Sequence, residues 1–256
     1  MLGIGLIKKG ELLMDKIMAL TLFQFKIKLR QYTDLFYKII FPVLLYLTFI
    51  SGTPEENHDN LLPLFIVIVI LINIILHYGS EFVRYRDLNF FVKYKLLGFK
   101  PLGVAMALYL NTLIFQLIGI AILSIIAIIV FEVSFPLLNL HNILIIFLII
   151  NFFQFSITFL LSSVFDEMEK YSPASQVVFY YQFFLGIFGI DIFTGTSRIL
   201  LDIFNPIVHG LEAMLGAWTL EKSILHFPME ISILLGLSLV FCIIASRNFQ
   251  WFKLKQ

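Results

Sequence analysis

Cysteine and charge are scarce in this 256-residue chain. The single cysteine, Cys242, lies inside an apolar run, so the chain has no disulfide framework and this residue is predicted to be a buried small hydrophobe. Charged residues make up only 14% of the sequence, whereas hydrophobic residues make up 60% and the mean hydropathy is +0.95. An ordinary soluble domain is far more polar. The composition therefore predicts a protein whose main solvent is lipid.

The sequence also lacks the motifs of several catalytic and metal-binding sites. It contains no GxxxxGK(S/T) loop for ATP phosphates, no GxSxG nucleophile motif and no HExxH zinc motif. Its five histidines are widely separated, and no pair of carboxylates inside an apolar run has helical spacing. We therefore predict no catalytic residue, no metal site and no cofactor in this chain, which is expected not to be an enzyme.

The N-terminal residues do not have the order of a signal peptide. Lys8 and Lys9 follow a short apolar stretch instead of preceding it, so no cleavage is expected. Met14 is an alternative start, because the clear structural pattern begins only after it.

Six apolar runs are candidates for membrane-spanning helices, because about 30 Å of hydrocarbon requires roughly 20 residues of helix. The predicted fold is an all-α integral membrane protein that forms one domain over residues 1–256. The first run is short, and the third is longer than a bilayer requires, so the third is expected to tilt or to project. The predicted spans are residues 35–50, 61–78, 102–131, 143–165, 173–193 and 229–249.

Basic residues gather on one side of this predicted topology. All of the 18 Lys and Arg residues except Arg198 and Lys222 fall before the first span, after an even-numbered span or at the edge of the first span. By the positive-inside rule this side is cytoplasmic, which places both termini in the cytoplasm. Lys38 lies at the edge of the first span, where its side chain can extend to the inner interface.

Residues 15–34 are predicted to form an amphipathic helix before the first span. Apolar residues recur at alternating steps of four and three from Met18 to Phe36, and basic residues flank that stripe. This pattern is typical of a helix that lies in the inner membrane interface. The alternative is a solvated lead-in that only anchors the chain.

Residues 81–100 are too polar to span a membrane and too aromatic for a simple linker, which indicates a surface that contacts a partner. Asp87 is predicted to cap a short helix that runs to about Leu97, and Gly98 with Pro101 is predicted to end it. The alternative is a basic loop that binds anionic lipid.

Residues 197–218 carry an apolar stripe opposite a polar face and lie between the fifth and sixth predicted spans. Asn205-Pro206 and Gly210 are predicted to break this segment into short re-entrant helices in the outer leaflet, with Trp218 at headgroup depth. Such helices are either a structural lid or a gate for an outgoing substrate.

The order of these parts resembles the permease subunits of ABC-2-type transporters. The similarity is greatest to small bacterial peptide or drug exporters, including exporters of amphipathic toxin peptides such as phenol-soluble modulins. The segments that carry the resemblance are Glu81-Phe-Val-Arg84 with Lys95-Leu-Leu-Gly-Phe-Lys-Pro101, similar to the ends of the family's coupling loop, and Asn205-Pro206 with Glu212, similar to its segment before the last span.

The resemblance implies two permease chains, alike or different, in the bacterial plasma membrane. Two separate cytoplasmic ATPase subunits would hold ATP and Mg²⁺ and dock on the interface helix and the coupling loop. No nucleic acid is expected as a partner. The residues expected to couple to the ATPase are Lys26, Arg30, Glu81, Arg84, Arg86, Asp87, Lys93 and Lys95, and the outer gate is expected at Asn205, Pro206 and Glu212.

The aromatic content indicates hydrophobic or amphipathic cargo, such as a peptide, toxin or drug. Phenylalanine supplies 29 residues, and the fifth predicted span holds a close aromatic cluster. The alternative is ordinary packing against lipid and other helices, and lipid-linked glycan is a competing cargo. The expected substrate path contains Gln176, Tyr180, Tyr181, Phe183 and Phe184.

Two other functional classes stay open at the level of sequence. An ion-coupled secondary transporter requires ionisable residues that face the interior of the bundle. A non-transporting membrane scaffold or immunity subunit would bind its partner without moving a substrate.

Overall fold

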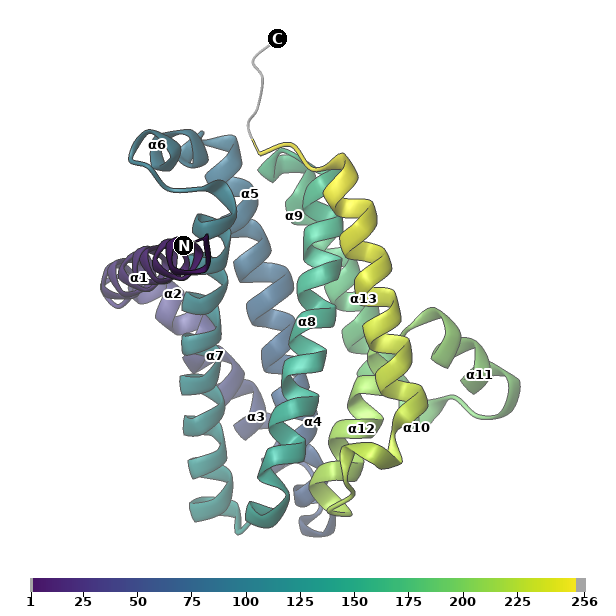
Figure 1. The fold of residues 1–256 in the computed structure, drawn as a ribbon. Coiled ribbons are helices and arrows are strands. Elements are labelled where there is room, and N and C mark those ends of the chain that lie inside the picture. The colour runs from purple at the N-terminus through teal and green to yellow at the C-terminus, as the bar shows by residue number, and fades with distance from the viewer. Residues whose placement is uncertain (1, 252–256) are drawn as a thin grey trace.

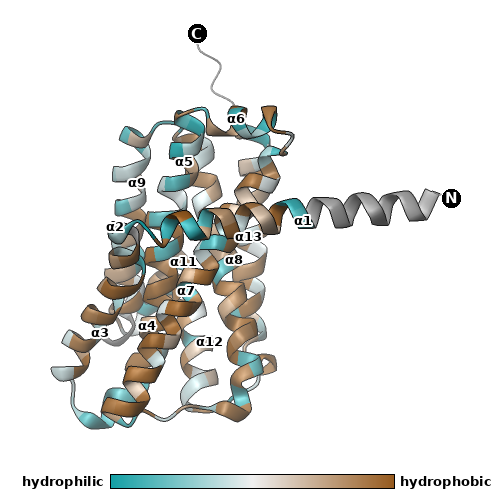
Figure 2. Ribbon diagram, turned by 90° about the vertical axis from the view of Figure 1, so that its left-hand side faces the viewer, coloured by the Kyte–Doolittle hydropathy of each residue, from teal (hydrophilic) through white to brown (hydrophobic). Residues whose placement is uncertain are grey.

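The computed structural model describes the backbone of residues 2–251 and the side chains of residues 15–33, 35–189 and 192–251. Within these residues every regular element is a helix, as the sequence predicts. Figure 1 shows the long helices side by side in one bundle. Helix α1 (Leu2–Lys28) is the exception, because it lies across the bundle and packs against α7 (Pro101–Phe131). Figure 2 shows this crossing from the side.

Among the described residues, four helices are long and apolar enough to cross a membrane, and a fifth is added if one bent pair is counted as a single span. They are compatible with a membrane protein and correspond to the predicted second, third, fourth and sixth spans. Their bounds are Glu55–Asp87, Pro101–Phe131, Leu137–Val164 and Pro228–Asn248.

The predicted first and fifth spans are not among these four, so the count of six spans is not confirmed. The first consists of α2 (Tyr32–Leu35), η1 (Phe36–Ile40) and α3 (Phe41–Ser51), and its apolar part is too short. The fifth consists of α9 (Met168–Tyr180), η5 (Tyr181–Ile187) and α10 (Gly189–Ile192) and includes many polar residues. Both segments nevertheless pack within the bundle, α3 on α4 and α7, and α9 on α5 and α8.

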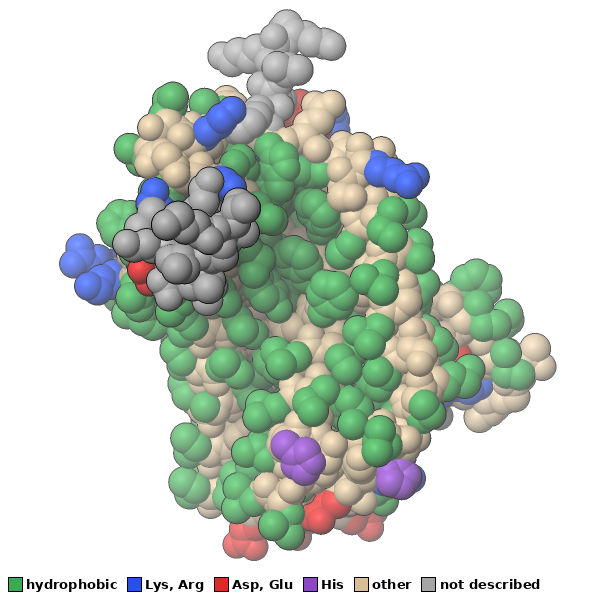
Figure 3. Space-filling view, in the orientation of Figure 1, with side chains coloured by type: hydrophobic (Ala, Val, Ile, Leu, Met, Phe, Trp, Pro, Cys, Tyr) green, Lys and Arg blue, Asp and Glu red, His purple; other side chains and the backbone are tan. Residues whose placement is uncertain are grey.

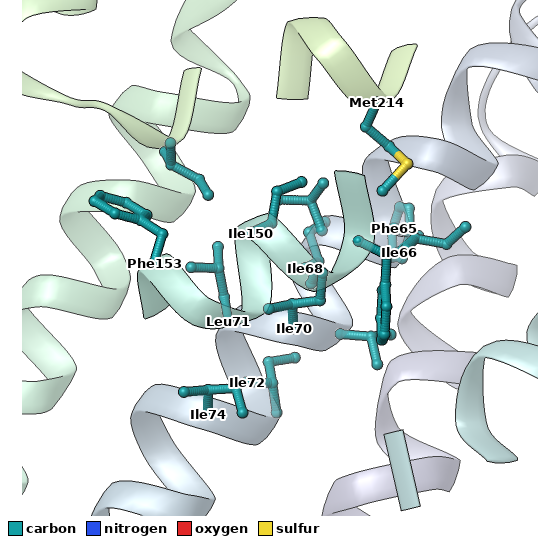
Figure 4. Packing of buried hydrophobic residues seen from close by; sticks show 14 of the residues in the cluster. Phe65, Ile66, Ile68, Ile70, Leu71, Ile72, Ile74, Ile150, Phe153 and Met214 are labelled. Atoms are coloured by element: carbon teal, nitrogen blue, oxygen red, sulfur yellow. The ribbon is translucent and has the colours of Figure 1, made fainter. Parts of the chain in front are cut away.

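The helix that corresponds to the predicted second span, Glu55–Asp87, forms the centre of the bundle. It consists of η2 (Glu55–Asn57), α4 (His58–Leu71), η3 (Ile72–Tyr78) and α5 (Gly79–Asp87) without a break. Ile68, Ile70 and Leu71 have no exposed surface, and Figure 4 shows them among side chains that include Ile150 and Met214. Residues 81–87 of the predicted loop therefore continue this helix as α5.

Three π-helical segments, η1, η3 and η5, interrupt the bundle helices. A π-helical turn disturbs the regular backbone hydrogen bonds and leaves carbonyl groups for other donors. Side chains from neighbouring elements supply these donors. Asn73 Nδ2 donates to Lys38 O of η1 at 3.4 Å, and Tyr171 Oη donates to Ile75 O of η3 at 2.9 Å. Asn205 Nδ2 donates to Tyr181 O of η5 at 3.2 Å. Each irregular segment is thus held by a contact between helices.

The chain between the fifth and sixth predicted spans bends sharply, as predicted. Helices α11 (Gly195–Phe204) and α12 (Ile207–Thr219) meet at 103° across Asn205 and Pro206. Helix α11 projects from the side of the bundle in Figure 1. By contrast, α12 packs on α4, on α8 (Leu140–Val164) and on α13 (Pro228–Asn248).

One expectation for this segment is wrong. Gly210 does not break the helix, because it lies inside α12, where an added Cβ would be 3.0 Å from Ile150 Cγ1. Trp218 is only 4% exposed, and its ring lies 5.2 Å from that of Phe135. Helix α12 is therefore part of the packed core, and the short helices η4 (Leu137–Asn139) and η6 (Ile224–His226) lie near its end.

Charge is distributed unevenly along the bundle. Figure 3 shows most of the visible Lys and Arg side chains at the end where α9 and α6 (Phe90–Leu96) lie, and Asp, Glu and His side chains at the opposite end. Hydrophobic side chains cover the surface between the two ends in this view. The described chain therefore has the charge polarity that the sequence predicts.

Candidate functional site at the α1–α5–α6 junction

The short helix α6 begins at a sharp backbone turn. Asn89 has a left-handed conformation with φ of 56°, which few residue types adopt easily and asparagine tolerates. Helix α6 then runs from Phe90 to Leu96, and Gly98, with φ of 80°, ends it before Pro101 opens α7. The predicted ending is confirmed. The predicted cap is wrong, because Asp87 is the last residue of α5 and the turn at Leu88 and Asn89 separates the two helices.

An aromatic cluster fixes α5 and α6 to the end of α13. Phe82 and Phe91 are buried, with ring centroids 5.4 Å apart. Phe249 lies 5.3 Å from Phe82, and Trp251 lies 5.6 Å from Phe91. Aromatic pairs at these distances add stabilisation beyond the burial of their area. The cluster holds α6 in a defined position at the end of the bundle.

Arg86 belongs to this cluster and is 2% exposed. Its Nη2 donates to Phe165 O at 2.9 Å, and its guanidinium lies 4.9 Å from the centre of the Phe249 ring. The sequence places Arg86 among the residues that contact an ATPase. In this structure the side chain instead joins α5 to the ends of α8 and α13, so it supports the surface from within.

A buried ion pair connects α1 to α5. Lys28 Nζ contacts Glu81 Oε2, and the two side chains are 5% and 18% exposed. Glu81 is a predicted coupling residue, whereas Lys28 is not. The only signal in the sequence was their opposite charge, because nothing local indicates a pair that is separated by 53 positions.

The other predicted coupling residues lie nearer the surface. Lys26 and Arg30 are exposed towards the C-terminal end of α1, and Asp87 is half-buried. Arg84, Lys93 and Lys95 are exposed on α5 and α6, and Lys93 Nζ lies 4.7 Å from the centre of the Phe90 ring.

Two leucines follow these lysines at the end of α6. Leu96 is 83% exposed and Leu97 is 72% exposed. They are not among the predicted coupling residues, although two apolar residues in a basic segment are a usable signal. Helix α6 therefore presents lysine and leucine side chains together at its exposed end.

A cavity of about 440 Å³ lies between α1, η1, α5 and α6. Its lining includes Gln24, Lys28, Lys38, Glu81 and Arg84. Lys38 is 1% exposed, and its Nζ lies 5.5 Å from the centre of the Phe115 ring. The expectation that this side chain extends outward to the inner interface is therefore wrong, because the protein encloses it. Two predicted coupling residues, Glu81 and Arg84, therefore line a cavity that the sequence did not reveal.

The predicted substrate path forms one face of α9 and η5. Gln176, Tyr180, Tyr181 and Phe184 are exposed, whereas Phe183 is partly buried beside Phe179 and Phe188. None of the five lines the junction cavity. Within a single described chain they form an open aromatic surface.

The predicted outer gate residues connect α11 to its neighbours. Arg198 on α11 forms ion pairs with Glu212 on α12 and, at 2.9 Å, with Asp202. Asn205 is fully buried beside η5, where its amide meets Tyr181 O. Pro206 lies at the bend itself. These contacts hold α11 and α12 in their bent arrangement.

No protein-family model, curated protein or solved structure gives a significant match to this chain.

Proposed function

We propose that this chain is the membrane subunit of an exporter and that separate cytoplasmic ATPase subunits dock on α6. The observation that carries the proposal is the exposed end of α6, where Lys93, Lys95, Leu96 and Leu97 project from a helix whose other face is packed. A surface that combines exposed leucines with positive charge is suited to a partner that has an apolar groove with an acidic rim.

The packing of α6 supports a role in force transfer. Phe91 is completely buried, and the aromatic cluster links α6 to α5 and α13. Helix α5 continues directly into the central helix of the bundle, and Lys28 joins it to α1. A displacement of α6 would therefore move packed helices as a unit, because closely packed interiors transmit strain.

The remaining parts of the proposal follow from the charge polarity and the exposed faces. The chain lies in a bacterial plasma membrane with α6 and both termini in the cytoplasm, on the side where basic residues gather. A second copy or a paralogue packs on the aromatic face of α9 and η5. Hydrophobic or amphipathic cargo passes beside that face, and ATP with Mg²⁺ binds only to the partner ATPase.

Co-purification of this chain with co-expressed ABC ATPase subunits from the same organism tests the docking surface. Replacement of Lys93 and Lys95 by glutamate is expected to weaken ATPase binding about tenfold at low salt, because it places like charges across the interface. Arg247→Glu is the matched control, since Arg247 is an exposed basic residue at the same end of the bundle but lies on α13.

Arg247→Glu distinguishes a specific docking site on α6 from general electrostatic attraction between the basic end of the chain and the ATPase. Unchanged ATPase binding after the double reversal, or an equal loss with Arg247→Glu, would show that α6 is not the docking site. Complete absence of a bound ATPase with the unmodified chain would reject the exporter proposal itself.

One observation favours a second candidate function, an ion-coupled transporter. Lys38 is buried beside the Phe115 ring, and an ionisable side chain inside a bundle is a common element of ion or proton transfer. Transport assays in vesicles distinguish the two. An ATP-driven exporter keeps its activity when an ionophore collapses the ion gradients, whereas an ion-coupled transporter loses it.

A further inference from the structure

The junction cavity contains a polar side chain without a hydrogen-bond partner. Gln24 lines the cavity and is 3% exposed, and neither its Nε2 nor its Oε1 atom has a partner within the described part of the chain. A buried amide without partners costs about 1–3 kcal/mol per unsatisfied group. Both amide atoms are covered by the surrounding side chains, so a rotation of the Gln24 side chain towards the cavity would bring the amide to a polar ligand there.

The charges around the cavity favour an anion. Of the described side chains that line it, Lys28, Lys38 and Arg84 are basic and Glu81 is acidic. Lys28 and Lys38 are almost completely buried, whereas Arg84 is exposed at the rim. Lys28 is paired with Glu81, so Lys38 and Arg84 are the two further basic side chains of the lining, and ammonium and guanidinium groups are suited to a phosphate group.

An apolar surface adjoins the cavity along η1. Phe36, Tyr37 and Ile40 are 39%, 51% and 47% exposed, and each follows or precedes Lys38 by only a few residues. The Tyr37 ring lies 6.1 Å from that of His77, which lines the cavity. Ile27, also in the lining, is 42% exposed. A ligand with a phosphate in the cavity would thus have apolar surface beside it.

We propose that this cavity binds the headgroup phosphate of an anionic phospholipid from the inner leaflet, with its acyl chains against the exposed apolar side chains of η1. The proposal rests on the membrane location and orientation proposed above, but not on a partner ATPase. A soluble phosphate compound would pair with the basic side chains of the cavity, but it would not cover the adjacent apolar side chains of η1.

Native mass spectrometry of the purified full-length chain in mild detergent tests the proposal. The probes are phosphatidylglycerol and phosphatidylcholine with the same acyl chains, and the water-soluble competitor is glycerophosphoglycerol. Phosphatidylglycerol is expected to bind about tenfold more tightly than phosphatidylcholine, and the deacylated competitor should displace it poorly. Arg84→Gln and Gln24→Leu should each reduce the preference for phosphatidylglycerol about tenfold.

Gln24→Leu provides a second readout, because it removes the unpartnered amide. This variant should raise the thermal unfolding midpoint in phosphatidylcholine while it lowers phosphatidylglycerol binding. Arg247→Gln is the control, since it removes an exposed basic residue of α13 that does not line the cavity. It should bind phosphatidylglycerol as the unmodified chain does.

Three outcomes would overturn the proposal. Equal binding of the two phospholipids would exclude recognition of the anionic headgroup. If glycerophosphoglycerol displaced bound phosphatidylglycerol as effectively as intact phosphatidylglycerol does, the cavity would be a site for a soluble phosphate compound. An equal loss in Arg84→Gln and Arg247→Gln would show general surface electrostatics. Because no ATPase is present in the experiment, the result is independent of the docking proposal.

Discussion

Gly79 shows how single residues control the packing of this bundle. It lies where η3 passes into α5, and a Cβ added there would be 1.7 Å from Tyr171 Oη and 2.8 Å from Thr158 Cγ2. The Tyr171 hydroxyl donates to Ile75 O at 2.9 Å, inside the π-helical segment. Glycine at position 79 therefore permits both the close approach of α9 and the hydrogen bond that satisfies η3.

Gly79→Ala is expected to destabilise the chain by about 3 kcal/mol, because the added methyl group overpacks a site that has no free space. Gly236→Ala is the matched control, since Gly236 also lies inside a helix but no atom is within 4 Å of its added Cβ. Thermal unfolding in detergent, followed by tryptophan fluorescence, should show a lower midpoint for the first variant only. Similar midpoints for both would contradict the close contact with Tyr171.

At the scale of elements, the position of α1 depends on a few contacts with α5 and α7. Lys28 pairs with Glu81 of α5, Asn111 Nδ2 of α7 donates to Thr21 O at 3.3 Å, and the rings of Phe25 and Phe115 are 5.0 Å apart. The ion pair is the most sensitive of these contacts, because loss of one partner leaves an uncompensated buried charge.

Lys28→Met or Glu81→Met alone is expected to cost about 3 kcal/mol, and the double variant Lys28→Met/Glu81→Met should recover much of that loss. A double-mutant cycle based on chemical denaturation measures this coupling. The control is Lys170→Gln, because the Lys170–Glu167 pair, at 3.1 Å, is much more exposed and should contribute less than about 0.5 kcal/mol. Additive losses at positions 28 and 81 would refute a direct interaction.

At the scale of the whole molecule, the separation of basic and acidic ends predicts the orientation in a membrane. Leu96 at the end of α6 is 83% exposed, and Leu225 in η6, just before α13, is 84% exposed. Figure 1 shows α6 and the start of α13 towards opposite ends of the bundle. Cys242 is the only cysteine, so a Cys242→Ser background allows either position to be labelled alone.

In that background, Leu225→Cys should react with a membrane-impermeant maleimide on intact cells, whereas Leu96→Cys should react only after permeabilisation. Gel-shift labelling measures both variants under the same conditions. The opposite pattern would invert the topology, and labelling of both in intact cells would argue against a membrane between these two ends.

Several boundaries were predictable from sequence because they depend on local chemistry. Pro101 begins α7 within one residue of the predicted start, and Gly98 ends the preceding segment with a positive φ. Asn205-Pro206 produces the predicted bend, since proline lacks the N–H that a continuous helix requires. Apolar run length likewise identified the four helices that are long and apolar enough to cross a membrane.

The locations of buried side chains were decided only by the tertiary structure. Hydropathy is the same for an aromatic residue that faces lipid and for one that faces another helix, so it could not show that Trp218 is buried or that Tyr180 is exposed. The positions of charged residues in the sequence could not show that Arg86 lies inside the aromatic cluster or that Lys28 pairs with Glu81. Composition and local backbone preferences therefore determined most of the long helices and those ends that Gly or Pro marks. The junction and its cavity depend on contacts between residues far apart in the chain, which form only when the helices pack.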